Sequence, residues 1–332
     1  MRLLLPATLA LFACSALGMS SGIANDEPAH AWPPQDRVVQ IIVATPLGTG
    51  PGDTIAKLLA RELSSKLGGH FVIETHNGIN GNIGANLVAS ARPDGTRLLF
   101  AGSGTLAVNP SLYKKPGFDP RASFDAIGLV AEAPNILVVN NHLPVDSLDD
   151  FTEYAQAYPG VVNFGSSGNG SAMHLAGQLY MNQTHTNMVH IPYSAIGLAM
   201  TNLISGEIQS MYQVVPDVLA QIKAGQIKPL AVMSTQRLAA LPDVPTMSEL
   251  GYPELVSSIW YALLAPKGTP QDVIARGNRA LNDILQEPEL RRALMGMGVL
   301  PLGGAPRDMD TLLERELEKW HAVVLDANIQ AQ

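Results

Sequence analysis

The stretch Val38-Val39-Gln40-Ile41-Ile42-Val43-Ala44-Thr45-Pro46-Leu47-Gly48-Thr49-Gly50-Pro51-Gly52-Asp53 decides the fold class of this chain. Its opening run, 38–43, is almost entirely apolar and β-branched, which predicts a buried strand. The glycines and prolines after it predict a tight turn. Apolar residues then recur at spacings of three and four, as on one face of a helix, at Ile55, Leu58, Leu59, Leu63 and Leu67. The whole stretch is therefore a strand–turn–helix unit.

The same alternation of strand and helix continues along the chain. Further strands are predicted at 71–74, 97–100, 136–139, 161–165, 188–191, 208–212, 229–233 and 260–265. Glycines at Gly68, Gly206 and Gly225 mark helix ends. Repeated strand–helix units predict an α/β protein with mainly parallel, doubly wound sheets that are covered by helices on both faces.

Two proline-rich segments, 134–144 and 241–253, flank a middle portion of the chain. We interpret this portion as a domain, 138–261, inserted into an outer domain made of 36–137 and 262–330. The chain is then expected to cross between the domains twice, at 136–140 and at 260–266. Two lobes joined by two strands form a hinge, and the crevice between them is a natural ligand site.

Composition and charge exclude several classes of protein. Of 332 residues, 46% are hydrophobic and 15% charged, which indicates a folded globular chain. The formal net charge is −8 and the sequence contains no cluster of Lys and Arg, so nucleic acid is not expected as a partner.

The N-terminus is typical of an export signal. Arg2 precedes a mostly apolar run, 3–17, and small residues follow, so we expect 1–24 to be a cleaved signal peptide and the mature protein to lie in the periplasm. Cleavage there removes the only cysteine, Cys14, and with it disulfides, thiolate metal sites and cysteine nucleophiles. In the alternative, Leu11-Phe12-Ala13-Cys14 is a lipobox and Cys14 is a lipid anchor.

The glycine-rich turn of the opening stretch is suited to an anion, because its backbone N–H groups can approach a ligand closely. It does not predict a nicotinamide cofactor, since Asp53 occupies the third glycine position of a dinucleotide-binding motif. No cofactor is expected elsewhere. Asp53 is interpreted first as a helix N-cap and second as a ligand contact.

A second turn, Phe164-Gly165-Ser166-Ser167-Gly168-Asn169-Gly170-Ser171-Ala172-Met173-His174, also follows a strand and opens a helix. Its hydroxyls, amide and backbone donors can hold a carboxylate without a buried positive charge. Ser171 is also a candidate N-cap, and the ring of His174 is expected to bond back to the turn in a structural role.

Catalytic alternatives find little support in these residues. A serine hydrolase would need Gly-x-Ser-x-Gly, but Gly165-Ser166-Ser167-Gly168 is one residue too short. His185 and His190 have no ligand partner at helical spacing, so no metal site is expected.

Nine short motifs, in order from Trp32 to Ala327, resemble the periplasmic solute-binding proteins of tripartite tricarboxylate transporters, the Bug family. They are the turn ending at Gly52-Asp53, then Gly81-Asn82-Ile83-Gly84-Ala85, Pro93-Asp94-Gly95, Asn109-Pro110-Ser111-Leu112-Tyr113, Pro134-Asn135-Ile136-Leu137-Val138-Val139, Ser166 to Ser171 with His174-Leu175-Ala176-Gly177, His190-Ile191-Pro192-Tyr193, Leu241-Pro242-Asp243-Val244-Pro245-Thr246 and Ala265-Pro266-Lys267-Gly268-Thr269-Pro270.

The resemblance implies a type II periplasmic binding fold of two α/β domains, without catalytic residues, that closes on a small carboxylate and delivers it to membrane permease subunits. A monomer is expected. The implied ligand-binding residues are Leu47, Gly48, Thr49, Gly50, Asp53, Ser103, Gly104 and Thr105 on the outer domain, and Ser167, Gly168, Asn169, Gly170, Ser171, His174, Tyr193, Ser194 and Gln213 on the inner one.

One departure from the family pattern concerns the ligand. Gln213 stands where an acidic residue is frequent in the family, and an acidic residue there could bind an ammonium group. We therefore expect a carboxylate without an amine. The same fold also serves sensor subunits that present their ligand to a membrane kinase, so sensing is the alternative to transport.

Overall fold

The computed structural model describes residues 32–34, 36–45, 50–76, 78–327 and 329. The predicted signal peptide and Cys14 lie outside the described residues, as do Leu47, Gly48 and Thr49. No helix among the described residues is long and apolar enough to cross a membrane.

Strands and helices alternate as predicted. The strands are β1 (Val38–Ala44), β2 (His70–Thr75), β3 (Arg97–Gly102), β4 (Phe124–Asn140), β5 (Asn163–Ser166), β6 (Val189–Pro192), β7 (Ser210–Val214), β8 (Ile227–Val232), β9 (Ser258–Pro266) and β10 (Leu300–Pro301). The helices are α1 (Gly52–Leu67), α2 (Asn82–Ala89), the π-helical η1 (Gly104–Val108), α3 (Asn109–Leu112), α4 (Leu148–Ala157), α5 (Ala172–Thr184), α6 (Ile196–Ser205), α7 (Val215–Lys223), α8 (Gln271–Gln286), α9 (Pro288–Gly296) and α10 (Pro306–Asp326).

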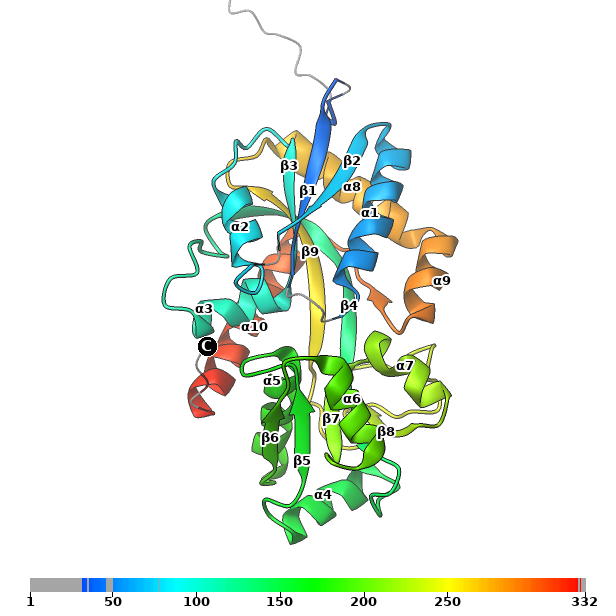
Figure 1. Cartoon of the computed structure of the whole chain (residues 1–332). Coiled ribbons are helices and arrows are strands. Elements are labelled where there is room, and N and C mark those ends of the chain that lie inside the picture. The colour runs from blue at the N-terminus through cyan, green and yellow to red at the C-terminus, as the bar shows by residue number, and fades with distance from the viewer. Residues whose placement is uncertain (1–31, 35, 46–49, 77, 328, 330–332) are drawn as a thin grey trace, which may run out of the picture. The chain divides into compact units, whose positions relative to one another are not determined.

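The strands form two sheets that share β4 (Figure 1). The first lobe holds the order β2-β1-β3-β9-β4-β10, and the second holds β8-β4-β7-β5-β6. β1 is parallel to β2 and β3, and β5 is parallel to β6 and β7. The prediction of mainly parallel sheets is wrong for the centre, where β4 pairs antiparallel with β7, β8 and β9. The reason is that β4 runs through both sheets, opposite in direction to the strands that flank it in each.

The two crossings lie close to their predicted places but not at them. Residues 124–134 of β4 pair with β9, and 135–140 pair with β7 and β8. The predicted return crossing at 260–266 is wrong, because all of β9 pairs inside the first lobe. The return instead passes through Ser257, whose N–H donates to the Met233 carbonyl while its own carbonyl accepts from Asn135 N–H. The domain boundaries at 137/138 and 261/262 stay a prediction.

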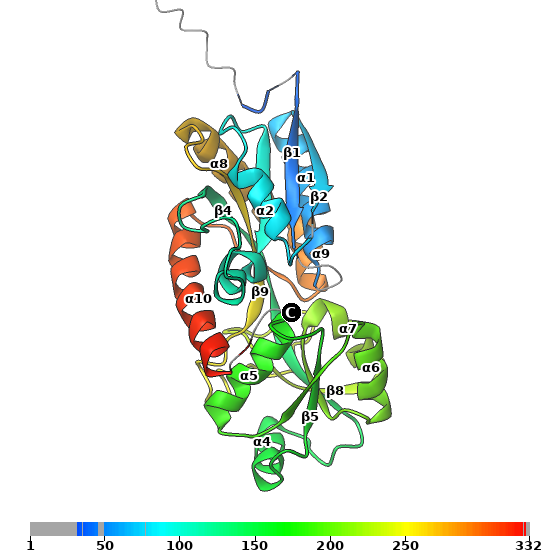
Figure 2. The ribbon, with the colours of Figure 1, turned by 60° about the vertical axis from the view of Figure 1, so that its left-hand side comes forward.

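Helices cover both faces of each sheet, as the side chains of β4 show, because successive residues point to opposite faces. Ile136 and Val138 pack among residues of α6 and α7, whereas Leu137 and Val139 pack among residues of α4 and α5. In the first lobe, α1, α8 and α9 cover one face, and α2 and α10 cover the other. The C-terminal helix α10 runs alongside β4 and also contacts α5 of the second lobe (Figure 2).

Candidate ligand-binding cleft

A cavity of about 320 Å³ lies where the carboxyl ends of the parallel strands of the two lobes face each other, which is the usual ligand site of open α/β sheets. Both lobes and α10 line it. The lining residues are Thr45, Asn80, Gly102, Ser103, Gly104, Val108, Asn109, Ser167, Asn169, Gly170, Ser171, Ala172, Met173, Leu175, Ser194, Ala195, Ile196, Gln213, Val214, Ser258, Ile259, Tyr261 and Trp320. None of these described lining residues is charged.

The turn between β5 and α5 forms one polar wall of the cavity. The Ser166 hydroxyl accepts from Gly168 N–H at 3.0 Å and lies 3.1 Å from the Gly168 carbonyl. Ser171 is the N-cap of α5, since its hydroxyl accepts from His174 N–H at 3.3 Å. The ring Nδ1 of His174 accepts from Gly170 N–H at 3.1 Å. The predicted cap and the predicted structural role of His174 are therefore confirmed.

A pair of stacked histidines supports this turn from below. The rings of His174 and His190 are 3.7 Å apart with planes 6° from parallel, and Phe164 packs against both. His190 Nε2 lies 2.5 Å from the Ser166 hydroxyl. Burial lowers the pKa of His174 to about 4, and burial with the neighbouring His174 lowers the pKa of His190 to about 4. Both rings are therefore neutral at neutral pH, and for His174 the bond from Gly170 N–H requires a neutral ring.

Gln213 offers a donor that the described residues do not use. Its side chain lines the cavity, although the residue as a whole is only 3% exposed. The side-chain oxygen accepts from Val214 N–H at 2.8 Å, which leaves the NH₂ group at the other end of the amide. Within the described part of the chain that NH₂ group has no hydrogen-bond partner. It is therefore free to donate to a ligand oxygen in the cavity.

The polar side chains of the first lobe are largely engaged within the protein. Asn109 donates to the Asn80 carbonyl at 3.0 Å and to the side-chain oxygen of Asn82 at 2.6 Å. Thr105 donates toward the carbonyls of Ala44 and Asn80, at 3.0 and 2.9 Å. Thr105 is not among the residues that line the cavity; its hydroxyl instead links the end of β1 to the turn before α2.

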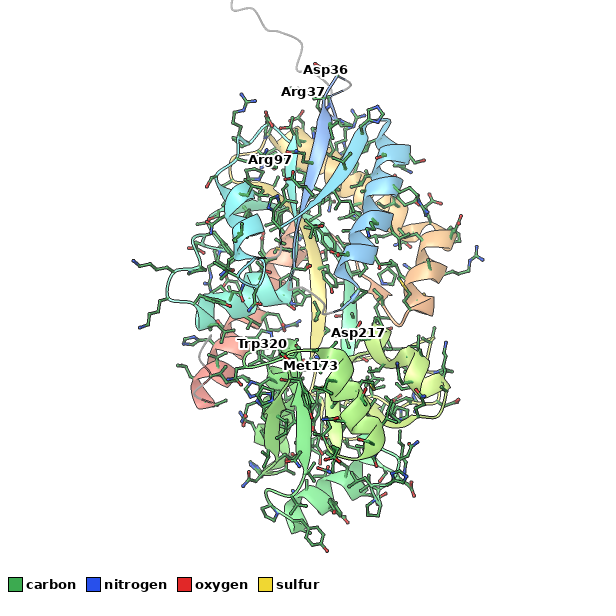
Figure 3. All side chains as sticks on the ribbon, viewed as in Figure 1. Asp36, Arg37, Arg97, Met173, Asp217 and Trp320 are labelled. Carbon is green, nitrogen blue, oxygen red and sulfur yellow. The ribbon has the colours of Figure 1, made fainter. Side chains whose placement is uncertain are left out.

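One hydrogen bond joins the lobes beside the cavity. Gly50 N–H, in the turn after β1, donates to the carboxylate of Asp217 on α7 at 3.1 Å. Burial raises the pKa of Asp217, and the bond from Gly50 opposes this rise. Figure 3 shows Asp217, Met173 and Trp320 at the level where the two lobes meet.

A family model described as the tripartite tricarboxylate transporter family receptor matches residues 55–329. This chain belongs to that receptor family. Protein BugT of Bordetella pertussis is 35% identical over 306 residues, which cover 92% of this chain and 93% of BugT.

Two solved structures resemble this receptor over most of its length. Rpa4515 of R. palustris with adipate has a TM-score of 0.77 and 31% identity, covering 90% of this chain and 99% of that one. MatC from Rhodopseudomonas palustris with bound malate has a TM-score of 0.72 and 28% identity, covering 86% of this chain and 99% of that one. The predicted periplasmic binding fold is confirmed.

The family is a receptor family and not an enzyme family. The local geometry explains why the Ser166–His190 pair does not act as the nucleophile and base of a hydrolase. Ser166 and His190 are within hydrogen-bond distance, but Ser166 is fully buried and its hydroxyl is engaged by Gly168. A nucleophile must reach its substrate, and this one serves the turn instead.

The cavity brings together a subset of the predicted ligand-binding residues. Those that line it are Ser103, Gly104, Ser167, Asn169, Gly170, Ser171, Ser194 and Gln213. Those described but outside the lining are Gly50, Asp53, Thr105, Gly168, His174 and Tyr193. The hydroxyl of Tyr193 accepts from Asn202 at 3.0 Å. Asp53 is exposed in the first turn of α1; the N-cap position is Pro51, so the N-cap prediction for Asp53 is wrong.

The apolar part of the lining was not predicted from the sequence. It includes Val108, Val214, Ile259, Tyr261 and Trp320. Val214 ends β7 and Ile259 lies near the start of β9, so both are close to the places where the chain crosses between the lobes. A correct prediction of the return crossing would have indicated them. Trp320 comes from the C-terminal helix, and no motif marks it.

Proposed function

We propose that this protein is an extracytoplasmic receptor that captures a small organic carboxylate by hinge closure and delivers it to the membrane subunits of a tripartite tricarboxylate-type transporter. The free amide of Gln213, buried in the cavity wall opposite the first lobe, is the observation that carries the proposal. Ser167 and Asn169 place further neutral donors at the start of α5, where the helix dipole also favours an anion.

The ligand of this receptor is a carboxylate without an amine. An ammonium group needs acceptors and gains most from a carboxylate beside it, yet the described lining contains neither Asp nor Glu. The adipate of Rpa4515 and the malate of MatC are acids without amines as well.

The location and the partners follow from the same proposal. Residues 1–24 direct export to the periplasm, with a lipid anchor at Cys14 as the alternative, and the receptor works there as a monomer. Ligand binding drives closure only if the closed state binds the carboxylate more tightly than the open state, and a permease would then recognise the closed form.

Thermal shift against a panel of mono-, di- and tricarboxylates and amino acids tests the proposal. The mature protein is first unfolded and refolded to remove any bound ligand. At a hundredfold excess over Kd, a ligand stabilises by about 2.7 kcal/mol, which is a visible rise in Tm. A rise with carboxylates alone supports the proposal. A flat panel, or a rise with amino acids only, overturns it.

A pair of matched variants sharpens this test. Gln213→Leu removes the donor, and we expect roughly a tenfold or greater loss of affinity, because hydrogen bonds to charged groups contribute about 1.5–3 kcal/mol. Gln226→Leu, at an exposed position, is the control and should keep its affinity. Equal affinities in the two variants would remove Gln213 from the site.

A further inference from the structure

The cavity has an apolar side that the capture of a carboxylate group does not explain. Val214 at the end of β7 and Ile259 and Tyr261 on β9 meet beside Gly50. A Cβ added to Gly50 would lie 2.9 Å from the Tyr261 hydroxyl, 3.4 Å from Ile259 and 3.9 Å from Val214. A Cβ added to Gly102 would lie 3.3 Å from the Tyr261 ring and 3.4 Å from Ile259. These three side chains therefore form one continuous surface, which we call the apolar wall.

The apolar wall is held in place by contacts behind it. The ring of Tyr261 stacks on Phe100, with centroids 5.3 Å apart and planes 9° from parallel. Nearby, Trp320 is fixed by its ring N–H, which donates to the buried Glu316 carboxylate at 2.9 Å. Since these rings are packed on their far sides, they cannot turn away to offer polar groups to a ligand.

Polar side chains close to the wall offer few free donors. Asn109 uses both hydrogens of its amide on Asn80 and Asn82. The Ser103 hydroxyl donates to the Ser258 carbonyl at 3.5 Å. Of the first-lobe side chains in the described lining, Thr45 and Tyr261 have hydroxyls that donate to no described group. Several hydroxyl groups along the body of a ligand would lose their water beside the described part of the wall and find too few partners to replace it.

We infer that the ligand of this cleft is an acid with a hydrocarbon body, and that the receptor rejects sugar acids and tricarboxylates. The inference rests on the proposed function and specifies its substrate class. The carboxylate lies against the donors of Gln213 and the turn at Ser167, and the body lies on the apolar wall. Monoacids and diacids both belong to this class, because the feature that defines it is the hydrocarbon body.

Matched acids that share a carbon skeleton test this inference by calorimetry on the refolded mature protein. Adipate is compared with galactarate, its tetrahydroxy counterpart, and hexanoate with gluconate; citrate represents tricarboxylates. An apolar pocket discriminates against one added hydroxyl by up to roughly a hundredfold, and we expect the four hydroxyls of galactarate together to weaken binding by about that factor. Each added methylene in a series of acids should strengthen binding roughly fourfold until the wall is covered.

The outcomes separate this inference from the proposed function. Galactarate, gluconate or citrate binding as tightly as the hydrocarbon acids overturns the inference and leaves the receptor function standing. No binding by any acid overturns the proposed function itself.

Two variants test whether the effect comes from the wall: Val214→Thr conserves the shape of the side chain, and Ile259→Thr also shortens it by one carbon. Ile259→Thr and Val214→Thr each put a hydroxyl into the wall, and we expect a threefold to tenfold weaker affinity for the better hydrocarbon acid with no loss for its hydroxylated counterpart. Val72→Thr, on an exposed position of β2, is the matched control. If both wall variants bind every acid as the control does, the assignment is overturned. Circular dichroism checks that each variant is folded.

Discussion

The glycine-rich turn after β5 and Gly50, which follows β1, are anchored in different ways. The turn after β5 is held by hydrogen bonds within its own lobe, through Ser166, Ser171 and His174. The turn after β1 is tied to the opposite lobe, through Gly50 and Asp217. The first arrangement keeps its shape however the lobes stand, whereas the second depends on their closing. We therefore expect the turn after β5 to be a preformed site and the turn after β1 to report closure.

Removing the support of the preformed turn should have the largest effect. His174→Ala leaves Gly170 N–H without its acceptor and leaves His190 without its stacking partner. We expect the free energy of unfolding to fall by about 2–3 kcal/mol, as for a lost buried partner plus lost packing. Affinity should fall at least tenfold. Urea unfolding and calorimetry measure both, with His142→Ala at an exposed position as the control. A variant with unchanged affinity would show that the turn does not need this support.

Acid should weaken the same turn. The pKa of His174 and of His190 is lowered from 6.5 to about 4 by burial, so the unfolded chain binds more protons than the folded chain between these values. Stability is therefore fully present above pH 6.5 and falls as the pH drops toward 4. The groups facing the pair, Phe164, Ser166 and Gly170, carry no charge that would offset this.

Urea midpoints at pH 7.5, 6, 5 and 4.5 check this dependence. His174→Gln keeps an acceptor for Gly170 N–H but removes one of the two titrating rings, so the midpoint should fall less steeply with pH, by about half of what the histidine pair contributes. Since all carboxylates titrate equally in both proteins, their contribution cancels in the difference. Parallel curves would contradict the assignment of the effect to this pair.

The turn after β1 should respond more weakly, and mainly in ligand binding. Asp217→Ala removes the acceptor of Gly50 N–H in the closed arrangement, and we expect affinity to fall by roughly threefold to tenfold. The unfolding free energy without ligand should change little, because burial already raises the pKa of Asp217 and so disfavours its charged form in the fold. Asp217→Asn retains an oxygen acceptor and should recover part of the affinity. A large loss of stability without ligand would instead make Asp217 part of the permanent core.

The contrast between the turns also explains what the sequence could predict. Local signals were sufficient for the alternating strands and helices, the cap at Ser171 and the bond of His174 to its own turn, because each depends on residues a few positions apart. The bond between Gly50 and Asp217 joins positions 167 apart, and no local pattern predicts it. The apolar run at 260–265 shows the same limit: hydrophobicity marks a buried strand, but only its pairing with β3 and β4 tells that it lies inside one lobe.

The smallest expected effect concerns Asp53, which lies next to the turn after β1 without lining the cavity. Its carboxylate is exposed in the first turn of α1 and makes no capping bond, so only the helix dipole gives it a role in stability. Asp53→Asn should lower the unfolding free energy by about 0.5 kcal/mol at low salt and less at high salt, because exposed charges are screened. Ligand affinity should stay the same at every salt concentration. A loss of affinity comparable to that of Asp217→Ala would mean that Asp53 takes part in closure, and the turn after β1 would then be held by two carboxylates instead of one.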